Sequence, residues 1–593
     1  MYTAPLRDMR FVLDHIIGWQ KFREFPAFRD LAPETVEAIL SEAGKLAADV
    51  LAPLNLPGDR QGARVENGQV RMPDGFRDAY HHYVQGGWNS LPFDPQYGGQ
   101  GLPWFLALMV QEMWQAANTS FSLCPMLNQG AVELLSAHGT EEQKKLFLPR
   151  LVSGEWTGTM NLTESQAGSD VGAVRARAMP EGDHYRITGQ KIYITYGDHD
   201  MAGNVIHMVL ARTGDAPPGT KGLSLFLVPK ILVHPDGTLG GRNDVELISI
   251  EHKLGIHASP TATLSFGDRT GALGWLVGSL NGGMACMFTM MNNARLSVGS
   301  QGVALAERAY QQAREYARTR LQGRGSRSDA PVTIIHHPDV RRMLLVMKAH
   351  VEAGRALAAV TAAALDTARH HPEETARQKA QARADLLTPV AKAWCTDMAV
   401  DITSIGIQVH GGMGYIEETG AAQHWRDSRI TPIYEGTNGI QASDLVFRKV
   451  VRDRGAAVEA LLGEIHAFMK DMTVLPGDDL AVMAEELAEA ITAFEDSTAW
   501  ILKMAGERPD SVAACAVLFL KLAGTVIGGW LLARGAVAAT LLMRESGGDA
   551  AFYEAKILTA RFYAEHILPQ VLGLVSAIQS GSLPVMGMGE EQF

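Results

Sequence analysis

The stretch MNLTESQAGSDVGAV, from Met160 to Val174, stands where the pattern of the sequence changes. Before it, from about residue 32, apolar residues recur at helical spacing, as in EEQKKLFLPRLVSG, a helix that Gly139 or Thr140 is placed to cap. After it, short alternating segments such as HYRITGQKIYIT and KGLSLFLVPK are separated by Gly, Pro and Asp turns. The sequence therefore predicts a helical domain followed by a small antiparallel β domain.

Helical spacing returns near residue 282 and continues to residue 452, in stretches long enough for the helices of a bundle. A short linker, RDRGAA, separates this region from an Ala-rich and Leu-rich tail, also with helical spacing. We expect an α+β fold with an N-terminal helical domain, a central antiparallel β domain, a helical bundle and an additional C-terminal helical domain. Their expected bounds are residues 1–154, 155–275, 276–452 and 458–593.

The composition is that of an ordinary globular protein, with 46% hydrophobic and 20% charged residues. A net charge of -12 argues against nucleic-acid binding, which requires clustered Lys and Arg, and favours small-molecule partners. The four cysteines form no C-x-x-C pair, and adjacent histidines such as His81 and His82 cannot share one helix face. We therefore expect buried free cysteines in a reducing compartment and no metal site.

Two apolar regions bear on targeting and membranes. The N-terminal residues 1–19 contain Arg7, Asp8 and other charges, which leaves no uninterrupted signal-peptide core. The most apolar stretch, from Val517, is interrupted by Lys521 and Arg534, and we interpret it as a buried core helix. The prediction is a cytoplasmic protein without stable membrane insertion.

A single carboxylate stands in TPIYEGTNGIQ, from Thr431 to Gln441, just before a predicted helix start. Taken alone, Glu435 is most simply an acid that interacts with the positive end of the helix. Likewise, Met160 to Val174 taken alone is most simply a polar loop, although its hydroxyls and turn N–H groups suit a ring edge or a phosphate.

Five segments in the same order resemble the acyl-CoA dehydrogenase family: the stretch from Met160, GQKIYIT from Gly189, YARTRLQG from Tyr316, QVHGGMGY from Gln408 and IYEGT at Ile433. The extra tail is similar to a long bacterial branch that acts on 3-methylthiopropanoyl-CoA or fatty acyl-CoAs. The resemblance implies FAD as cofactor. It implies FAD contacts for Met160, Leu162, Thr163, Gly168, Ser169, Tyr193, Thr195, Arg320, Gln322, Gln408, Gly412 and Thr437.

Two positions depart from the family pattern. Tyr193 stands where Trp is commoner, and it could equally be a core strand residue, while RLQGRG replaces a continuation closer to Phe-Gly and weakens the assignment of Gln322. Alternation places Tyr193 and Thr195 on one face of a strand, where both can contact the flavin. Since the family shares its flavin across a subunit contact, the resemblance implies a homodimer or a higher homo-oligomer.

The resemblance implies that Glu435 removes the α-proton of an acyl-CoA thioester while the flavin takes the β-hydride, giving a trans-2-enoyl-CoA. It assigns substrate contacts to Ser169, Arg295, Glu435 and Gly436, although Arg295 is equally compatible with a structural ion pair. The expected electron acceptor is an electron-transfer flavoprotein. Two alternatives remain: an acyl-CoA oxidase that uses O2, and a non-catalytic acyl-CoA-binding scaffold, which the presence of Glu435 disfavours.

Overall fold

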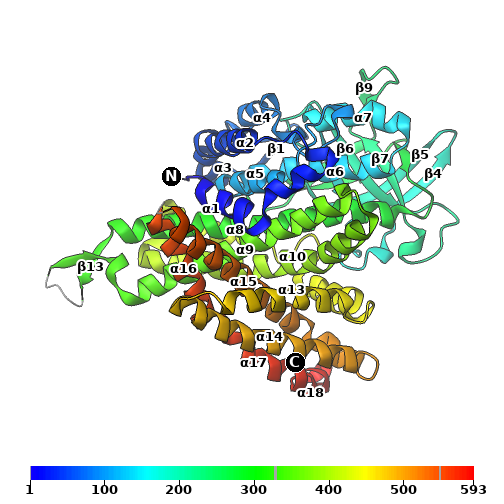
Figure 1. Cartoon of the computed structure of the whole chain (residues 1–593). Coiled ribbons are helices and arrows are strands. Elements are labelled where there is room, and N and C mark those ends of the chain that lie inside the picture. The colour runs from blue at the N-terminus through cyan, green and yellow to red at the C-terminus, as the bar shows by residue number, and fades with distance from the viewer. Residues whose placement is uncertain (1, 326–329, 547–548) are drawn as a thin grey trace. The chain divides into compact units, whose positions relative to one another are not determined.

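Two compact units make up the protein, seen in a computed structural model that describes residues 2–325, 330–546 and 549–593 (Figure 1). Unit 1 consists of Met1–Ala4, Ser41–Pro103 and Met113–Ser297, and unit 2 of Pro5–Leu40, Trp104–Glu112 and Val298–Phe593. Three helices contribute residues to both units: α2 (Pro33–Lys45), α5 (Trp104–Ala117) and α8 (Gly283–Thr319).

Unit 1 combines a β-sheet with short and medium helices, coloured from blue to green in Figure 1. Its other helices are α3 (Asn55–Gln61), α4 (Phe76–Gln85), α6 (Thr119–His138) and α7 (Glu141–Ser153). Its strands are β1 (Arg64–Glu66), β2 (Gln69–Arg71), β3 (Trp156–Asn161), β4 (Arg177–Glu181), β5 (His184–Thr195), β6 (Asn204–Ala211), β7 (Ser224–Pro229), β8 (Ile231–Val233), β9 (Leu239–Arg242), β10 (Val245–Ile250), β11 (Thr261–Phe266) and β12 (Ala272–Val277). The short β1–β2 hairpin was not expected in the helical region.

The main sheet has eight strands in the order β10-β11-β5-β12-β7-β6-β3, with β4 paired to β5. All its pairs are antiparallel except β3 with β6, which are parallel. Strands β6 and β7 are buried along their whole length, and most of their residues are apolar, as is typical of strands covered on both faces. The predicted fold class is confirmed, and the parallel edge pair is a local difference from a purely antiparallel sheet.

Unit 2 is almost entirely helical. Its further helices are α1 (Leu6–Phe11), α9 (Pro338–His370), α10 (Glu374–His410), α11 (Ala421–Ser428), α12 (Asn438–Ser443), α13 (Ala456–Thr473), α14 (Asp478–Met504), α15 (Pro509–Ser546), α16 (Ala550–His566), α17 (Gln570–Ser580) and α18 (Ser582–Gly587), and its short strands are β13 (Leu321–Arg324) and β14 (Pro331–Thr333). Helix α15 packs against α9, α10, α14 and α16. Helix α15 thus joins the C-terminal helices to the bundle that contains α9 and α10.

Helix ends follow the local sequence. Thr140 caps α7 through a capping box with Gln143, so of the two predicted candidates the hydroxyl residue serves. Helix α10 ends at His410, and the next residue, Gly411, adopts a positive φ of 59° with which the helix cannot continue.

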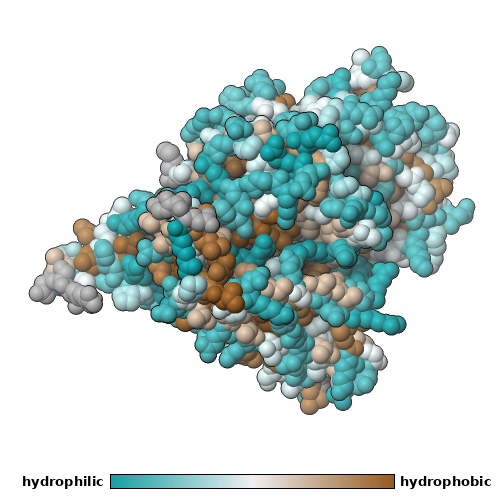
Figure 2. Space-filling view, in the orientation of Figure 1, coloured by the Kyte–Doolittle hydropathy of each residue, from teal (hydrophilic) through white to brown (hydrophobic). Residues whose placement is uncertain are grey.

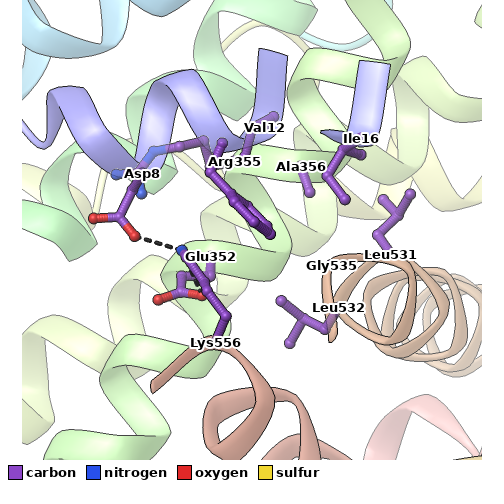
Figure 3. Close-up of a pocket in the computed structure, with 11 residues that line it drawn as sticks. Asp8, Val12, Ile16, Glu352, Arg355, Ala356, Leu531, Leu532, Gly535 and Lys556 are labelled. Atoms are coloured by element: carbon purple, nitrogen blue, oxygen red, sulfur yellow. Dashed lines mark hydrogen bonds and ion pairs between the residues drawn. The ribbon is translucent and has the colours of Figure 1, made fainter. Parts of the chain in front are cut away.

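Charged side chains tie the N-terminal segment to the C-terminal helices inside unit 2. Figure 3 shows Lys556 of α16 directed between Asp8 of α1 and Glu352 of α9, with its ammonium 3.0 Å from the Glu352 carboxylate and paired with Asp8. Although burial opposes it, the neighbouring Lys556 and Lys348 lower the pKa of Asp8 to about 2. The N-terminal segment is therefore part of the C-terminal bundle, despite its distance in sequence.

Helix α15 is the one described helix long and apolar enough to cross a membrane, but 72% of its most apolar window is buried inside the structure. This agrees with the interpretation of the stretch from Val517 as a core helix. On the face drawn in Figure 2, hydrophobic side chains gather near the place where Figure 1 labels α16. The four cysteines are free and buried, as expected.

Candidate active site

A buried ion pair in unit 1 joins two of the signature segments. Lys191 of β5 donates to the Leu162 carbonyl and to the Glu164 carboxylate, each at 2.9 Å. Both side chains are buried, at 0% and 6% exposed. The carboxylate also accepts the backbone N–H groups of Arg175 and Ala176, at 2.7 and 3.0 Å. The loop after β3 is thereby fixed against strand β5.

The pKa directions of this pair follow from its burial. Burial lowers the pKa of Lys191 to about 8, although Glu164 opposes the shift. Burial also raises the pKa of Glu164, but Lys191 and the two backbone N–H groups outweigh it and bring this pKa below its usual value. At neutral pH the pair is therefore charged.

Tyr193 lies on a β-bulge of β5. The register against β11 shifts between Ala262 and Leu264, and Tyr193 has a φ of 58°, which is uncommon for a residue with a side chain. The bulge interrupts the simple alternation on which the sequence argument for a shared face with Thr195 relied. It leaves the Tyr193 side chain in an exposed position, at 61%.

The backbone places Thr163 beside this aromatic residue. The N–H of Ile192 donates to the Thr163 carbonyl at 3.0 Å, one residue before Tyr193. Thr163 and Thr195 are both half-buried. Two hydroxyls and one exposed aromatic ring thus occur on the same part of unit 1.

The other predicted cofactor residues of unit 1 lie in β3 and in the loop that follows it. Met160 is half-buried in β3, Leu162 is buried, and Gly168 and Ser169 are exposed. A Cβ at Gly168 would meet no atom within 4 Å, so open space lies beside the loop backbone. An exposed aromatic plane, adjacent hydroxyls and an open small-residue loop fit the ring and diphosphate of FAD.

Glu435 lies in unit 2 on a turn before α12. Its φ of 56° and the φ of 83° at Gly436 make two successive left-handed residues. The side-chain amide of Gln441 donates to the carbonyls of Glu435 and Gly436, at 3.2 and 3.3 Å. Thr437 caps α12 by accepting the N–H of Ile440 at 3.3 Å, so the predicted helix start is correct.

Tyr434, the residue before Glu435, is held in place by a hydrogen bond from its hydroxyl. Tyr434 donates to the side-chain oxygen of Gln301 on α8. Burial, together with the neighbouring Glu435 carboxylate, raises the pKa of Tyr434 well above its usual value. A left-handed non-glycine residue costs on the order of 1–3 kcal/mol and persists where its surroundings enforce it, which is typical of functional sites.

The predicted residues for the adenine and diphosphate end lie on exposed parts of unit 2. Arg320 follows α8, and its carbonyl accepts the N–H of Ile334 at 2.9 Å at the base of the β13–β14 hairpin. Gln322, Gln408 and Gly412 are exposed as well. Their contacts with FAD stay a prediction.

Arg295 is buried in unit 1 on α8. Its guanidinium lies 6.0 Å from the ring centre of Phe288 and contacts the Asn292 side chain. The two sequence interpretations of this residue, a role in the active site or a structural ion pair, both remain open. Among the described residues, no group of three or more His, Cys, Asp or Glu side chains could hold a metal ion.

Sequence reasoning missed the polar residues that support the predicted site residues within each unit. Lys191 and Glu164 support the loop after β3, and Lys392 and Asn438 support the turn of Glu435. A signal was present for Lys392, which is the one charge in the largely apolar run LLTPVAKAWC of its helix. Strand β5 also contains Arg186 and several polar residues, so Lys191 did not stand out. A buried charge requires a partner. Glu164 lies in the signature stretch from Met160, and Asn438 directly follows IYEGT.

Four family models match the chain in succession: the acyl-CoA dehydrogenase N-terminal domain at residues 33–155, the middle domain at 159–269, the C-terminal domain at 281–449, and an acetyl-CoA dehydrogenase C-terminal-like domain at 461–589. These segments lie close to the expected domains. The expected domain bounds themselves stay a prediction.

Known relatives match the chain along nearly its whole length. The chain is 47% identical to 3-methylmercaptopropionyl-CoA dehydrogenase of Ruegeria pomeroyi, over 96% of each chain. It is 36% identical to a butyryl-CoA dehydrogenase of Syntrophomonas wolfei, over 100% of this chain and 99% of the relative. The fold matches an acyl-CoA dehydrogenase of Bacillus anthracis complexed with FAD, with a TM-score of 0.73, 20% identity and coverage of 96% and 91%. The chain therefore belongs to the acyl-CoA dehydrogenase family and is an FAD-dependent oxidoreductase.

Proposed function

We propose that Glu435 is the catalytic base that removes the α-proton of an acyl-CoA thioester, giving the trans-2-enoyl-CoA. Bound FAD supplies the acceptor for the β-hydride. The observation that carries the proposal is the strained left-handed turn that presents Glu435 in the signature segment, anchored by Gln441 and Tyr434. A base must be held within hydrogen-bond reach of the proton it abstracts, and a fixed turn provides this.

Proton removal also requires stabilisation of the enolate that forms at the thioester oxygen. The family resemblance implies two hydrogen-bond donors to this oxygen, the backbone N–H of the catalytic Glu and a ribityl hydroxyl of the cofactor. In this chain the two left-handed residues, Glu435 and Gly436, would direct both the carboxylate and its own N–H at one thioester. Ser169, Arg295 and Gly436 are the further residues that we propose to contact the substrate.

We propose 3-methylthiopropanoyl-CoA as the preferred substrate, because the relative named for this substrate is 47% identical over 96% of the chain. Short straight-chain acyl-CoAs come second, since a butyryl-CoA dehydrogenase is 36% identical over the whole chain. The two acyl groups are of similar length and differ in a thioether sulfur, so discrimination between them is expected to be modest.

We further propose that electrons pass to an electron-transfer flavoprotein, that the enzyme acts in the cytoplasm, and that it is a homodimer or a larger homo-oligomer. The exposed positions of Arg320, Gln408 and Gly412 support a flavin completed by a second subunit. Apolar side chains next to them, Met413 and Tyr415 at 48% and 85% exposed, support a covered surface.

The test is anaerobic reduction of the FAD-loaded enzyme by a panel of acyl-CoAs, followed by product analysis. We expect the flavin absorbance to bleach fastest with 3-methylthiopropanoyl-CoA and an enoyl-CoA to form. Failure of every saturated acyl-CoA to bleach the flavin contradicts the function. In air, a high peroxide yield without reduction of an electron-transfer flavoprotein would instead indicate an oxidase.

A further inference from the structure

A fully buried lysine in unit 2 contacts both ends of the turn that carries Glu435. The ammonium of Lys392, on α10, donates to the Thr431 carbonyl at 2.9 Å and to the Asn438 side-chain oxygen at 2.8 Å. Lys392 is 0% exposed, and Thr431 is likewise 0% exposed. The six residues between these two contacts, 432–437, include Glu435.

Asn438 is the second member of this arrangement. Its side-chain NH2 group donates to the Thr396 hydroxyl and the Asp397 carboxylate, at 2.9 and 2.7 Å, and its backbone N–H donates to the Pro432 carbonyl at 2.9 Å. One residue thus closes the turn through its backbone and fastens it to α10 through its side chain. Lys392 completes the closure by bridging to the other end.

Small residues make this geometry possible. A Cβ at Gly299 would lie 2.8 Å from the Ala391 carbonyl, and a Cβ at Gly302 would lie 2.5 Å from the Cys395 carbonyl. Helices α8 and α10 therefore approach closely on either side of Lys392. The same approach brings Gln301 of α8 within hydrogen-bond reach of Tyr434.

These contacts act on the strained part of the turn. Glu435 with a φ of 56° has a conformation that an unrestrained chain seldom adopts, so the two ends must be held for it to persist. Without the Lys392 ammonium, the buried Thr431 carbonyl and the Asn438 oxygen lose a charged donor. The turn would then relax and move the carboxylate away from the reacting atoms.

We propose that Lys392 is a positioning residue for the dehydrogenation, because it spans the turn from Thr431 to Asn438 and thereby fixes the placement of the Glu435 carboxylate. This inference rests on the proposed function, in which Glu435 is the base. Lys392 itself touches neither substrate nor cofactor in this account. Its effect on the reaction is on the alignment of the base.

The test compares two variants of the FAD-loaded enzyme, Lys392→Met and Asn438→Ala, with Lys556→Met as control. Lys556 is a buried lysine of the same unit, at 6% exposed, that bonds Asp8 and Glu352 and not the turn. Each protein is assayed for flavin content, thermal unfolding, KM, and the rate of flavin reduction at saturating acyl-CoA.

We expect Lys392→Met to reduce flavin on the order of 10²-fold more slowly, because a misplacement of about 1 Å has this effect, with KM changed less than about threefold and flavin content retained. Asn438→Ala is expected to act in the same direction, and it carries the test if Lys392→Met does not fold. Lys556→Met should lower the unfolding temperature and leave the reduction rate within about twofold. If folded Lys392→Met and Lys556→Met reduce their flavin at the same rate, the proposal is overturned.

A Glu435→Gln variant separates the hypothesis that Glu435 is the base from the hypothesis that Lys392 positions it. If Glu435→Gln retains the reduction rate, the assignment of the base is wrong whatever Lys392 does. If Glu435→Gln loses the rate and both Lys392→Met and Asn438→Ala retain it, the proposed function stands and the positioning role of Lys392 fails.

Discussion

Replacing Arg355 by Met is expected to be among the most destabilising single changes in unit 2. Its guanidinium, with the side chain 1% exposed, donates to Glu112 at 2.6 and 2.9 Å and to Glu307 at 2.7 Å. The two carboxylates are also buried, at 3% and 5% exposed. Figure 3 shows Arg355 on α9 near the Asp8, Glu352 and Lys556 group.

The magnitude follows from the charges left behind. Removal of one partner from a buried ion pair costs about 3–5 kcal/mol, because the remaining charge is desolvated and uncompensated. Here one substitution leaves two buried carboxylates, those of Glu112 and Glu307, without their cation. We therefore expect the free energy of unfolding, measured in urea at pH 7, to fall by the upper part of this range. Adding Glu112→Gln to the Arg355→Met variant should recover part of this loss.

The pH dependence supplies a second test. Burial raises the pKa of Glu112 in the native protein, and Arg355 opposes this shift. Without Arg355 the pKa of Glu112 in the folded state rises further. The folded state then binds more protons than the unfolded state above about pH 4.5. The loss of stability should therefore be largest at neutral pH and shrink as the pH falls toward that value.

The exposed pair of Arg342 with Asp339, at 51% and 71% side-chain exposure, provides the control. Arg342→Met should change the unfolding free energy by less than about 1 kcal/mol. If Arg355→Met is no more destabilising than Arg342→Met, or if its loss is independent of pH, the reasoning from burial is wrong.

Two other predictions concern unit 1. Burial lowers the pKa of His199 to about 4 and of His207 to about 3, so the unfolded state binds more protons below pH 6.5. Acidification from pH 6.5 to about 4 should thus lower the unfolding free energy, by up to about 1.4 kcal/mol per pH unit for each histidine, and a flat urea-unfolding profile over this range contradicts it. Lys191→Met should reduce retained FAD, measured as the flavin-to-protein absorbance ratio, because the loop after β3 loses its buried anchor at Glu164. Glu164→Gln combined with Lys191→Met should restore part of the flavin, and unchanged flavin in the single variant would show that the ion pair does not support the loop.

Local features of the fold were predictable from the sequence because their causes are local. The Thr140 cap, the end of α10 before Gly411 and the start of α12 after Thr437 each depend on residues within one helical turn. The β segments followed from their alternation. The buried core helix followed from the two charges, Lys521 and Arg534, in its apolar run.

Long-range features were not predictable in this way. The parallel pairing of β3 with β6 and the contact of Asp8 with Lys556 join segments whose own sequences contain no record of the partner. The bulge at Tyr193 could not be read from the alternation of β5, because it arises from the register against β11. The turn of Glu435 was found from its signature, whereas the buried Lys392 that fastens it required the structure.

The central claim is that Glu435 is the base, and stopped-flow reduction of the Glu435→Gln enzyme by its best acyl-CoA under anaerobic conditions tests it most directly. A positioned general base contributes about 10²–10⁴-fold to the rate. The account predicts a loss of at least that order with flavin content and acyl-CoA binding retained. A Glu435→Gln enzyme that reduces its flavin within a few-fold of the unsubstituted rate would contradict it.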